Sequence, residues 1–181
     1  MTQSPIITPQ AAIRVRGLSK FFGPIDEGAI ARTGPEFGTA RDPLSGSIVA
    51  AWDVNFDVAA GEALGIVGES GSGKSTVLRC IAGDQPSSAG SVHLMCHDEG
   101  RTNVLDLSPA ARRKLRIDQL SVVYQDPAEG LSLGVTAGGN IADPLTAAGW
   151  RNFEAIRVRA RDLLDRTEVP LDRMDDIVRN F

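Results

Sequence analysis

Apolar and polar residues alternate most regularly in residues 52–58, the segment WDVNFDV. Alternation with a period of two is typical of a strand that buries one face. The shorter segments 13–15 and 91–95 predict two further strands in the same way. Two mostly apolar runs, 63–67 and 120–124, instead predict buried strands.

Helical spacing follows some of these segments. Residues 74–82 place apolar side chains on one helix face, and Gly83 is a typical helix stop. A Ser-Pro pair at 108–109 is typical of a helix start, so the arginines and lysine after it are expected on a solvated face. The pattern is helical again from Gly138 onward. The last long helix should end at Pro170 and bury one face, formed by Ile156, Ala160, Leu163 and Leu164.

Residues 23–47 are rich in glycine, proline and charge and show no sustained period. This stretch is longer than most loops, which favours an exposed, mobile insertion over residues 24–47. Residues 1–11 are expected to form an N-terminal tail.

The segment between the first apolar run and the first helix carries the clearest chemistry. Residues 68–76, GESGSGKST, fit the phosphate-loop pattern, and a strand before it and a helix after it are the required context. Glycines let successive backbone N–H groups turn toward phosphate oxygens, and the helix N-terminus adds a positive dipole end. The nucleotide-binding residues predicted here are Gly68, Ser70, Gly71, Ser72, Gly73, Lys74, Ser75 and Thr76.

Two side chains of this loop have distinct expected roles. Lys74 should reach the β- and γ-phosphates of ATP, and the Ser75 hydroxyl should bind Mg²⁺. The alternative is a glycine-rich turn with a chance lysine. The context on both sides favours a nucleoside-triphosphate site.

Composition excludes several kinds of partner and of cellular location for this protein. The formal net charge of -4 argues against a nucleic-acid partner, and no apolar run reaches the length of a membrane span. No basic segment followed by an apolar stretch marks the N-terminus as a secretory signal. Cys80 and Cys96 are the only cysteines, which fits a reducing cytosol, so we expect a cytoplasmic protein. His93, Cys96 and His97 offer metal-ligand chemistry, but a surface hairpin is the favoured interpretation.

Taken together, these motifs resemble the nucleotide-binding subunits of ATP-binding-cassette (ABC) proteins. The resemblance implies an α/β fold of the P-loop NTPase class over residues 12–181. It would comprise an antiparallel β subdomain, part of a parallel core sheet and the start of a helical subdomain at about 126–181. It also implies that Phe22 stacks on adenine, although Phe21 could serve as well. Gln125 would approach Mg²⁺ and the attacking water as a catalytic and metal-binding residue beside Lys74.

A closer resemblance is to ATPase subunits of the bacterial phosphonate carbon–phosphorus lyase system. It rests on residues 125–131 and 135–141, and the segment 169–181 is also similar. ATPases of peptide or nickel importers are the alternative. Partners implied are a second ATPase subunit with either carbon–phosphorus lyase subunits or transporter permeases. If the chain is a transporter subunit, a peripheral position at the inner membrane would follow.

The family's later motifs are absent from these 181 residues. No signature Ser-Gly-Gly, no apolar strand ending in Asp-Glu and no late switch histidine occurs. Asp175 and Asp176 are not the Asp-Glu element, because no apolar strand precedes them. The sequence therefore predicts a truncated ATPase that binds nucleotide but does not hydrolyse it alone. A non-catalytic nucleotide-binding module is the remaining alternative.

Overall fold

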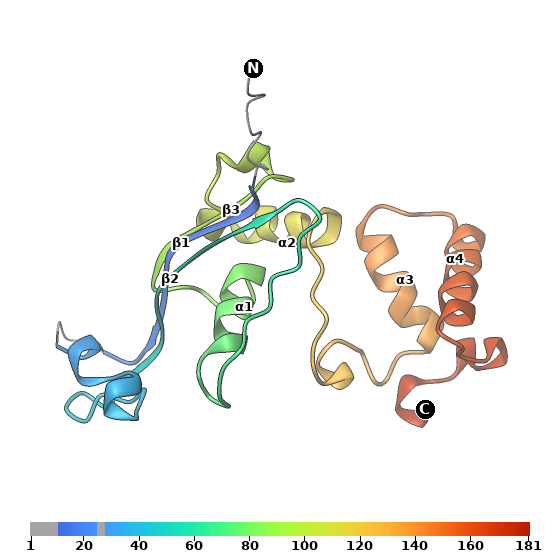
Figure 1. Cartoon of the computed structure of the whole chain (residues 1–181). Coiled ribbons are helices and arrows are strands. Elements are labelled where there is room, and N and C mark those ends of the chain that lie inside the picture. The colour runs from blue at the N-terminus through green and yellow to red at the C-terminus, as the bar shows by residue number, and fades with distance from the viewer. Residues whose placement is uncertain (1–10, 25–27) are drawn as a thin grey trace, which may run out of the picture. The chain divides into compact units, whose positions relative to one another are not determined.

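The computed structural model describes residues 11–24 and 28–181 (Figure 1). The predicted N-terminal tail, except Ala11, lies outside the described residues, as does part of the predicted insertion. The chain divides into two compact units, residues up to Leu115 and residues 116–181. The helical subdomain predicted from about residue 126 falls within the second unit. Within the described ranges, no helix is both long and apolar enough to cross a bilayer.

A three-stranded antiparallel sheet organises the first unit. Its strands are β1 (Ala11–Phe22), β2 (Ile48–Ala59) and β3 (Ala89–Leu94), in the order β2-β1-β3. The three alternating segments of the sequence are confirmed as strands, and β1 and β2 are each longer than their patterns predict. In β2 the alternation has its expected effect, because Asp53, Asn55 and Asp57 are exposed while Val58 is buried.

Helix α1 (Lys74–Ala82) packs against one face of this sheet. Gly83 ends it in the left-handed conformation, as predicted. Helix α2 (Pro109–Asp118) begins where the sequence predicts, and the Ser108 hydroxyl accepts a hydrogen bond from the Ala111 N–H at 3.3 Å. The shared core consists of Val15, Leu18, Val77, Cys80, Val92, Leu94, Val104 and Leu115.

The second unit is built on α3 (Ala137–Ala147) and α4 (Phe153–Arg166). Each helix has a side-chain cap: Thr136 accepts from the Gly139 N–H, and Asn152 accepts from the Ala155 N–H. Their buried contact includes Ala137, Ala160, Leu164 and Met174. Short 3₁₀ helices complete the chain: η1 (Ile30–Arg32), η2 (Pro35–Phe37), η3 (Asp98–Gly100), η4 (Val104–Asp106), η5 (Pro127–Glu129), η6 (Leu171–Asp175) and η7 (Val178–Asn180).

The predicted end of the last long helix is wrong. Helix α4 ends at Arg166, before Pro170 is reached. The Thr167 N–H bonds to two carbonyls of the last turn, and Glu168 adopts a positive φ of 59°. A residue in the left-handed region turns the chain out of the helix, so the proline only begins the following 3₁₀ turn.

The two apolar runs predicted as parallel strands are not strands in this structure. Residues 63–67 and 120–124 have no regular secondary structure, and Val67 and Val123 are 92% and 95% exposed. A strand exists only when a neighbour completes its hydrogen bonds, and within the described residues no strand pairs with either run. The described sheet is thus the antiparallel part of the expected fold.

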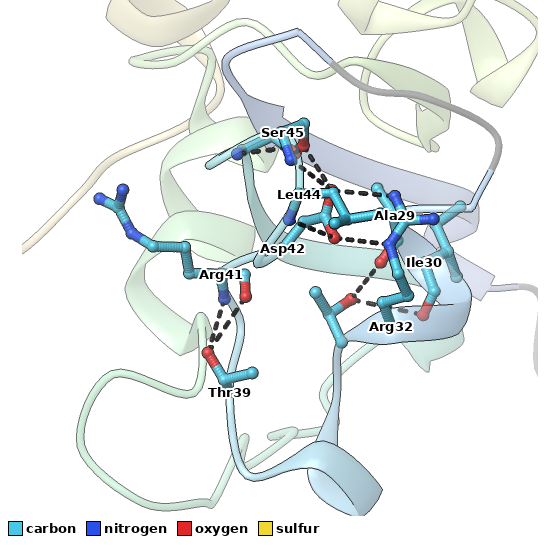
Figure 2. Close-up of polar contacts among 10 residues, drawn as sticks. Ala29, Ile30, Arg32, Thr39, Arg41, Asp42, Leu44 and Ser45 are labelled. Carbon is cyan, nitrogen blue, oxygen red and sulfur yellow. Dashed lines mark hydrogen bonds and ion pairs between the residues drawn. The ribbon is translucent and has the colours of Figure 1, made fainter.

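Residues 28–47, the described part of the segment predicted as an exposed, mobile insertion, contain two 3₁₀ turns and a buried carboxylate, Asp42, whose polar contacts Figure 2 shows. Asp42 is 0% exposed and accepts hydrogen bonds from the Arg32 guanidinium at 2.7 and 3.0 Å. The Ser45 hydroxyl and N–H donate to the same carboxylate at 2.5 and 3.0 Å. A buried charge is tolerated only when it is paired and hydrogen-bonded, and this one is both. The network orders much of the segment.

Replacing Asp42 with asparagine should lower the thermal midpoint at neutral pH. The amide keeps the shape but leaves the Arg32 guanidinium without its counter-ion. Arg32 and Ser45 hold the pKa of Asp42 well below its ordinary value of 3.8. A depressed folded-state pKa contributes stability that is present above that ordinary value and is lost as the pH falls below it. The wild-type advantage should therefore shrink in acid, which differential scanning calorimetry from pH 7 to pH 3 would measure.

Asp57→Asn is the matched control for this prediction. Asp57 pairs with Arg16 at 2.6 Å, but both side chains are nearly half exposed, so solvent screens the pair. Equal losses of thermal midpoint in the two variants would contradict a special role for the buried carboxylate.

Candidate nucleotide-binding site

The glycine loop between residues 68 and 73 has the backbone that an anion site needs. Gly68, Gly71 and Gly73 have φ of 154°, 80° and 91°. Gly73 is also the N-cap of α1, and no side chain caps this helix end. The amide N–H groups of the first helical turn are therefore left for an anion, which the helix dipole also favours.

Gly73 is required by a close approach of two backbones. A Cβ built at Gly73 would lie 1.9 Å from the carbonyl oxygen of Ala50 in β2. No side chain fits in that space, so the loop and the strand hold one another in place. The motif requires a glycine at position 73, but the contact between Gly73 and Ala50 of β2 could not be predicted from the sequence.

The Lys74 ammonium bends back over the loop. Its Nζ donates to the carbonyl oxygens of Gly68 at 2.9 Å and Glu69 at 2.6 Å, and it lies 3.4 Å from the Ser72 hydroxyl. These partners are exposed loop atoms, which water can satisfy when the ammonium leaves. The charge is thus held at the mouth of the loop, free to exchange its carbonyls for phosphate oxygens.

The other polar residues of the motif lie around this lysine. Ser70, Ser72 and Ser75 are exposed, and Thr76 is half-buried. Ser75 stands in the first turn of α1. An exposed alcohol oxygen next to bound phosphates is a suitable ligand for Mg²⁺, so the residues present fit this ion.

A mostly apolar hollow lies beside the loop. It has a volume of about 460 Å³ and is lined on one side by β2, including Ala51 and Val54, and on the other by residues 64–67 and 72–74. A lysine ammonium next to an apolar surface is an arrangement that suits a nucleotide, which has a charged tail and a flat base.

Phe21 and Phe22 lie on opposite faces of the sheet. Phe21 contacts Trp52, with ring centroids 5.8 Å apart. Phe22 contacts Lys20, and Lys20 pairs with Ala51 on β2. Ala51 packs against the core that the sheet shares with α1, and it also lines the hollow. Cross-strand partners point to the same face. Through Lys20, Phe22 is assigned to the face that Ala51 shares, and it is 39% exposed. Trp52, which Phe21 contacts, also lines the hollow, so the role of Phe22 stays a prediction.

Gln125 belongs to the second unit and is exposed. The sequence predicts that Gln125 ends a strand, but residues 120–124 form no strand in this structure. Its catalytic and metal-binding role stays a prediction. His93 makes a local contact with the Gly100 carbonyl at 3.1 Å, and in residues 11–24 and 28–181 no group of three His, Cys, Asp or Glu side chains is placed to hold a metal ion.

Comparison with known proteins shows the family of this chain. The family profile of ABC transporters matches residues 52–179. The chain is 43% identical over 129 residues to the phosphonates utilization ATP-binding protein PhnK of Escherichia coli (strain K12), covering 71% of this chain and 49% of that protein. It is 34% identical over 128 residues to the dipeptide transport ATP-binding protein DppD of Lactococcus lactis subsp. cremoris (strain MG1363), covering 70% of this chain and 36% of that protein.

Solved structures give the same result. A dimeric structure of MJ0796, a bacterial ABC transporter cassette, has a TM-score of 0.70 and 26% identity, covering 93% of this chain and 62% of that one. A post-hydrolysis dimer of the same cassette, bound to ADP and Pi, has a TM-score of 0.71 and 24% identity over the same shares. The chain thus spans about half of PhnK and less than two thirds of the solved cassettes. On this match, which covers more than half of its length, the chain belongs to the ABC transporter ATPase family and carries part of that family's nucleotide-binding domain.

Proposed function

We propose that this chain binds Mg-ATP through the loop at residues 68–76. The observation that carries the proposal is the Lys74 ammonium, which is held at the loop mouth by carbonyl oxygens of Gly68 and Glu69. On binding, the ammonium exchanges these carbonyls for β- and γ-phosphate oxygens. Backbone N–H groups of the loop and of the first turn of α1 bind the remaining oxygens, and the Ser75 hydroxyl binds Mg²⁺.

The base and the water complete the proposed site. The purine stacks on Phe22, which faces the same side of the sheet as the hollow beside the loop. Gln125 orients the water that attacks the γ-phosphate. Mg²⁺, when bound, neutralises charge on the phosphates; the contribution of this chain is to position the triphosphate.

Isothermal titration calorimetry of the purified chain with Mg-ATP and with AMP tests the binding proposal. Mg-ATP should bind and AMP should bind far more weakly, because AMP lacks the β- and γ-phosphates that Lys74 contacts. A folded sample that gives no heat with millimolar Mg-ATP would refute the proposal.

Hydrolysis requires more than these residues supply. Members of this family hydrolyse ATP between two subunits, each completing the other's site. We propose that this chain works with a second ATPase subunit and that the isolated chain has no turnover of its own. Release of inorganic phosphate by the pure chain, abolished by Lys74→Ala, would show that the described residues suffice.

The pathway that we propose is phosphonate utilisation. Its support is the 43% identity to PhnK, which exceeds the 34% identity to DppD over a similar length. The second candidate is the ATPase of a peptide importer. Affinity purification from the native cell separates them. Carbon–phosphorus lyase subunits should accompany the protein in the first case, and membrane permeases in the second.

A further inference from the structure

Lys20 lies where it can act on the proposed base site without touching the phosphates. Its Nζ is 4.8 Å from the centroid of the Phe22 ring. This distance is within the range in which a ring face attracts a cation. Lys20 and Phe22 are two residues apart on β1, so both side chains project from the same face of the sheet.

That face is the one that carries the phosphate loop. Lys20 pairs directly with Ala51 on β2, and Ala51 lines the hollow that also contains Gly73 and Lys74. Burial raises the pKa of the Cys80 thiol on α1, and the positive charge of Lys20 partly offsets this by lowering the same pKa. The Lys20 ammonium is thus in contact with the Phe22 ring and close enough to α1 for its charge to act on Cys80.

A stacked base needs an aromatic ring with a fixed orientation and one free face. Phe22 stands at the last position of β1 and is 39% exposed, so few other contacts fix its ring. A cation on one face holds the ring in place and leaves the opposite face for a flat ligand. Ordering the ring before the ligand arrives removes part of the entropic cost of binding.

We propose that Lys20 is a positioning residue for nucleotide binding: its ammonium covers one face of Phe22, and the purine occupies the other. The inference rests on the proposed function, since it assumes that the loop at residues 68–76 binds the triphosphate. It adds a residue that contributes to recognition of the base rather than of the phosphates.

Lys20→Met tests this in the whole chain, because methionine keeps the unbranched stem and removes the charge. Dissociation constants are measured by calorimetry for Mg-ATP and for Mg-tripolyphosphate, which has no base. Mg-ATP should bind about threefold more weakly, the size expected of one exposed cation–π contact, and Mg-tripolyphosphate should be unchanged. Lys20→Arg should restore Mg-ATP binding, since arginine makes the same kind of contact.

Two further arms make the test specific. In a Phe22→Ala background, Lys20→Met should have no further effect on Mg-ATP, because the ring through which it acts is gone. Lys114→Met removes the same charge from the exposed side of α2 and should change neither ligand.

The outcomes separate the possibilities. Equal weakening of both ligands by Lys20→Met would mean that the ammonium acts on the phosphates and would overturn the proposal. So would an undiminished effect in the Phe22→Ala background, or no effect on Mg-ATP. Failure of the wild-type chain to bind either ligand would instead refute the phosphate site itself, and with it this inference.

Discussion

Lys74→Ala should weaken Mg-ATP binding by about 100-fold, because the triphosphate loses charge-assisted hydrogen bonds worth about 1.5–3 kcal/mol each. The variant should fold as well as the wild type. In the part of the chain that the structure describes, the Lys74 ammonium bonds to exposed loop residues, whose carbonyls water can satisfy in its absence. Calorimetry gives the affinity, and the thermal midpoint without ligand reports the fold.

Lys114→Ala is the matched control, since it removes an equal charge from an exposed position on α2. It should leave the affinity within about twofold of wild type, because an exposed charge outside the loop is largely screened by salt. If both variants bind Mg-ATP equally well, Lys74 does not contact the phosphates, and the loop is only a glycine-rich turn.

Gly73→Ala should cost more stability than any other single methyl added to the phosphate loop. The new Cβ would overlap the Ala50 carbonyl at 1.9 Å, and the residue would also have to keep a φ of 91°. The left-handed backbone costs roughly 1–2 kcal/mol and overpacking about 1–3 kcal/mol, so we expect a loss of roughly 2–5 kcal/mol. Chemical denaturation measures this loss, and Mg-ATP binding should fall with it as the loop moves away from β2.

Gly71→Ala separates the two contributions. Gly71 has a similar φ of 80°, but nothing lies within 4 Å of a Cβ built there. Gly71→Ala should therefore lose only the stability that the left-handed backbone costs, about 1–2 kcal/mol. Equal losses at the two positions would mean that the contact with Ala50 is not made in solution.

Much of the local structure could be predicted from the sequence because its causes are local. The alternation in β2, the glycine after α1 and the Ser-Pro start of α2 each determine the structure of their own neighbourhood. The turn glycines at residues 68–73 and the helix behind them belong to the same group because they are contiguous, whereas the strand expected before them did not form.

The predictions that failed depend on distant partners. An apolar run becomes a parallel strand only beside other strands, so residues 63–67 and 120–124 could not be assigned from their own composition. The buried carboxylate of Asp42 is likewise paired with Arg32 across ten positions, which no period reveals. The faces of Phe21 and Phe22 likewise depend on the register of β1 against β2, and which of them stacks on the base stays a prediction.

The connection between β1 and β2 leaves and re-enters the sheet at one point. A Cβ on Gly23 would lie 3.4 Å from the Cα of Ser47, and the Val49 N–H bonds to the Ala40 carbonyl at 2.9 Å. Because the two junctions adjoin, the enclosed residues can be exchanged for a short turn without separating the strands. The pairing of β1 with β2 should therefore tolerate changes in the length of this segment.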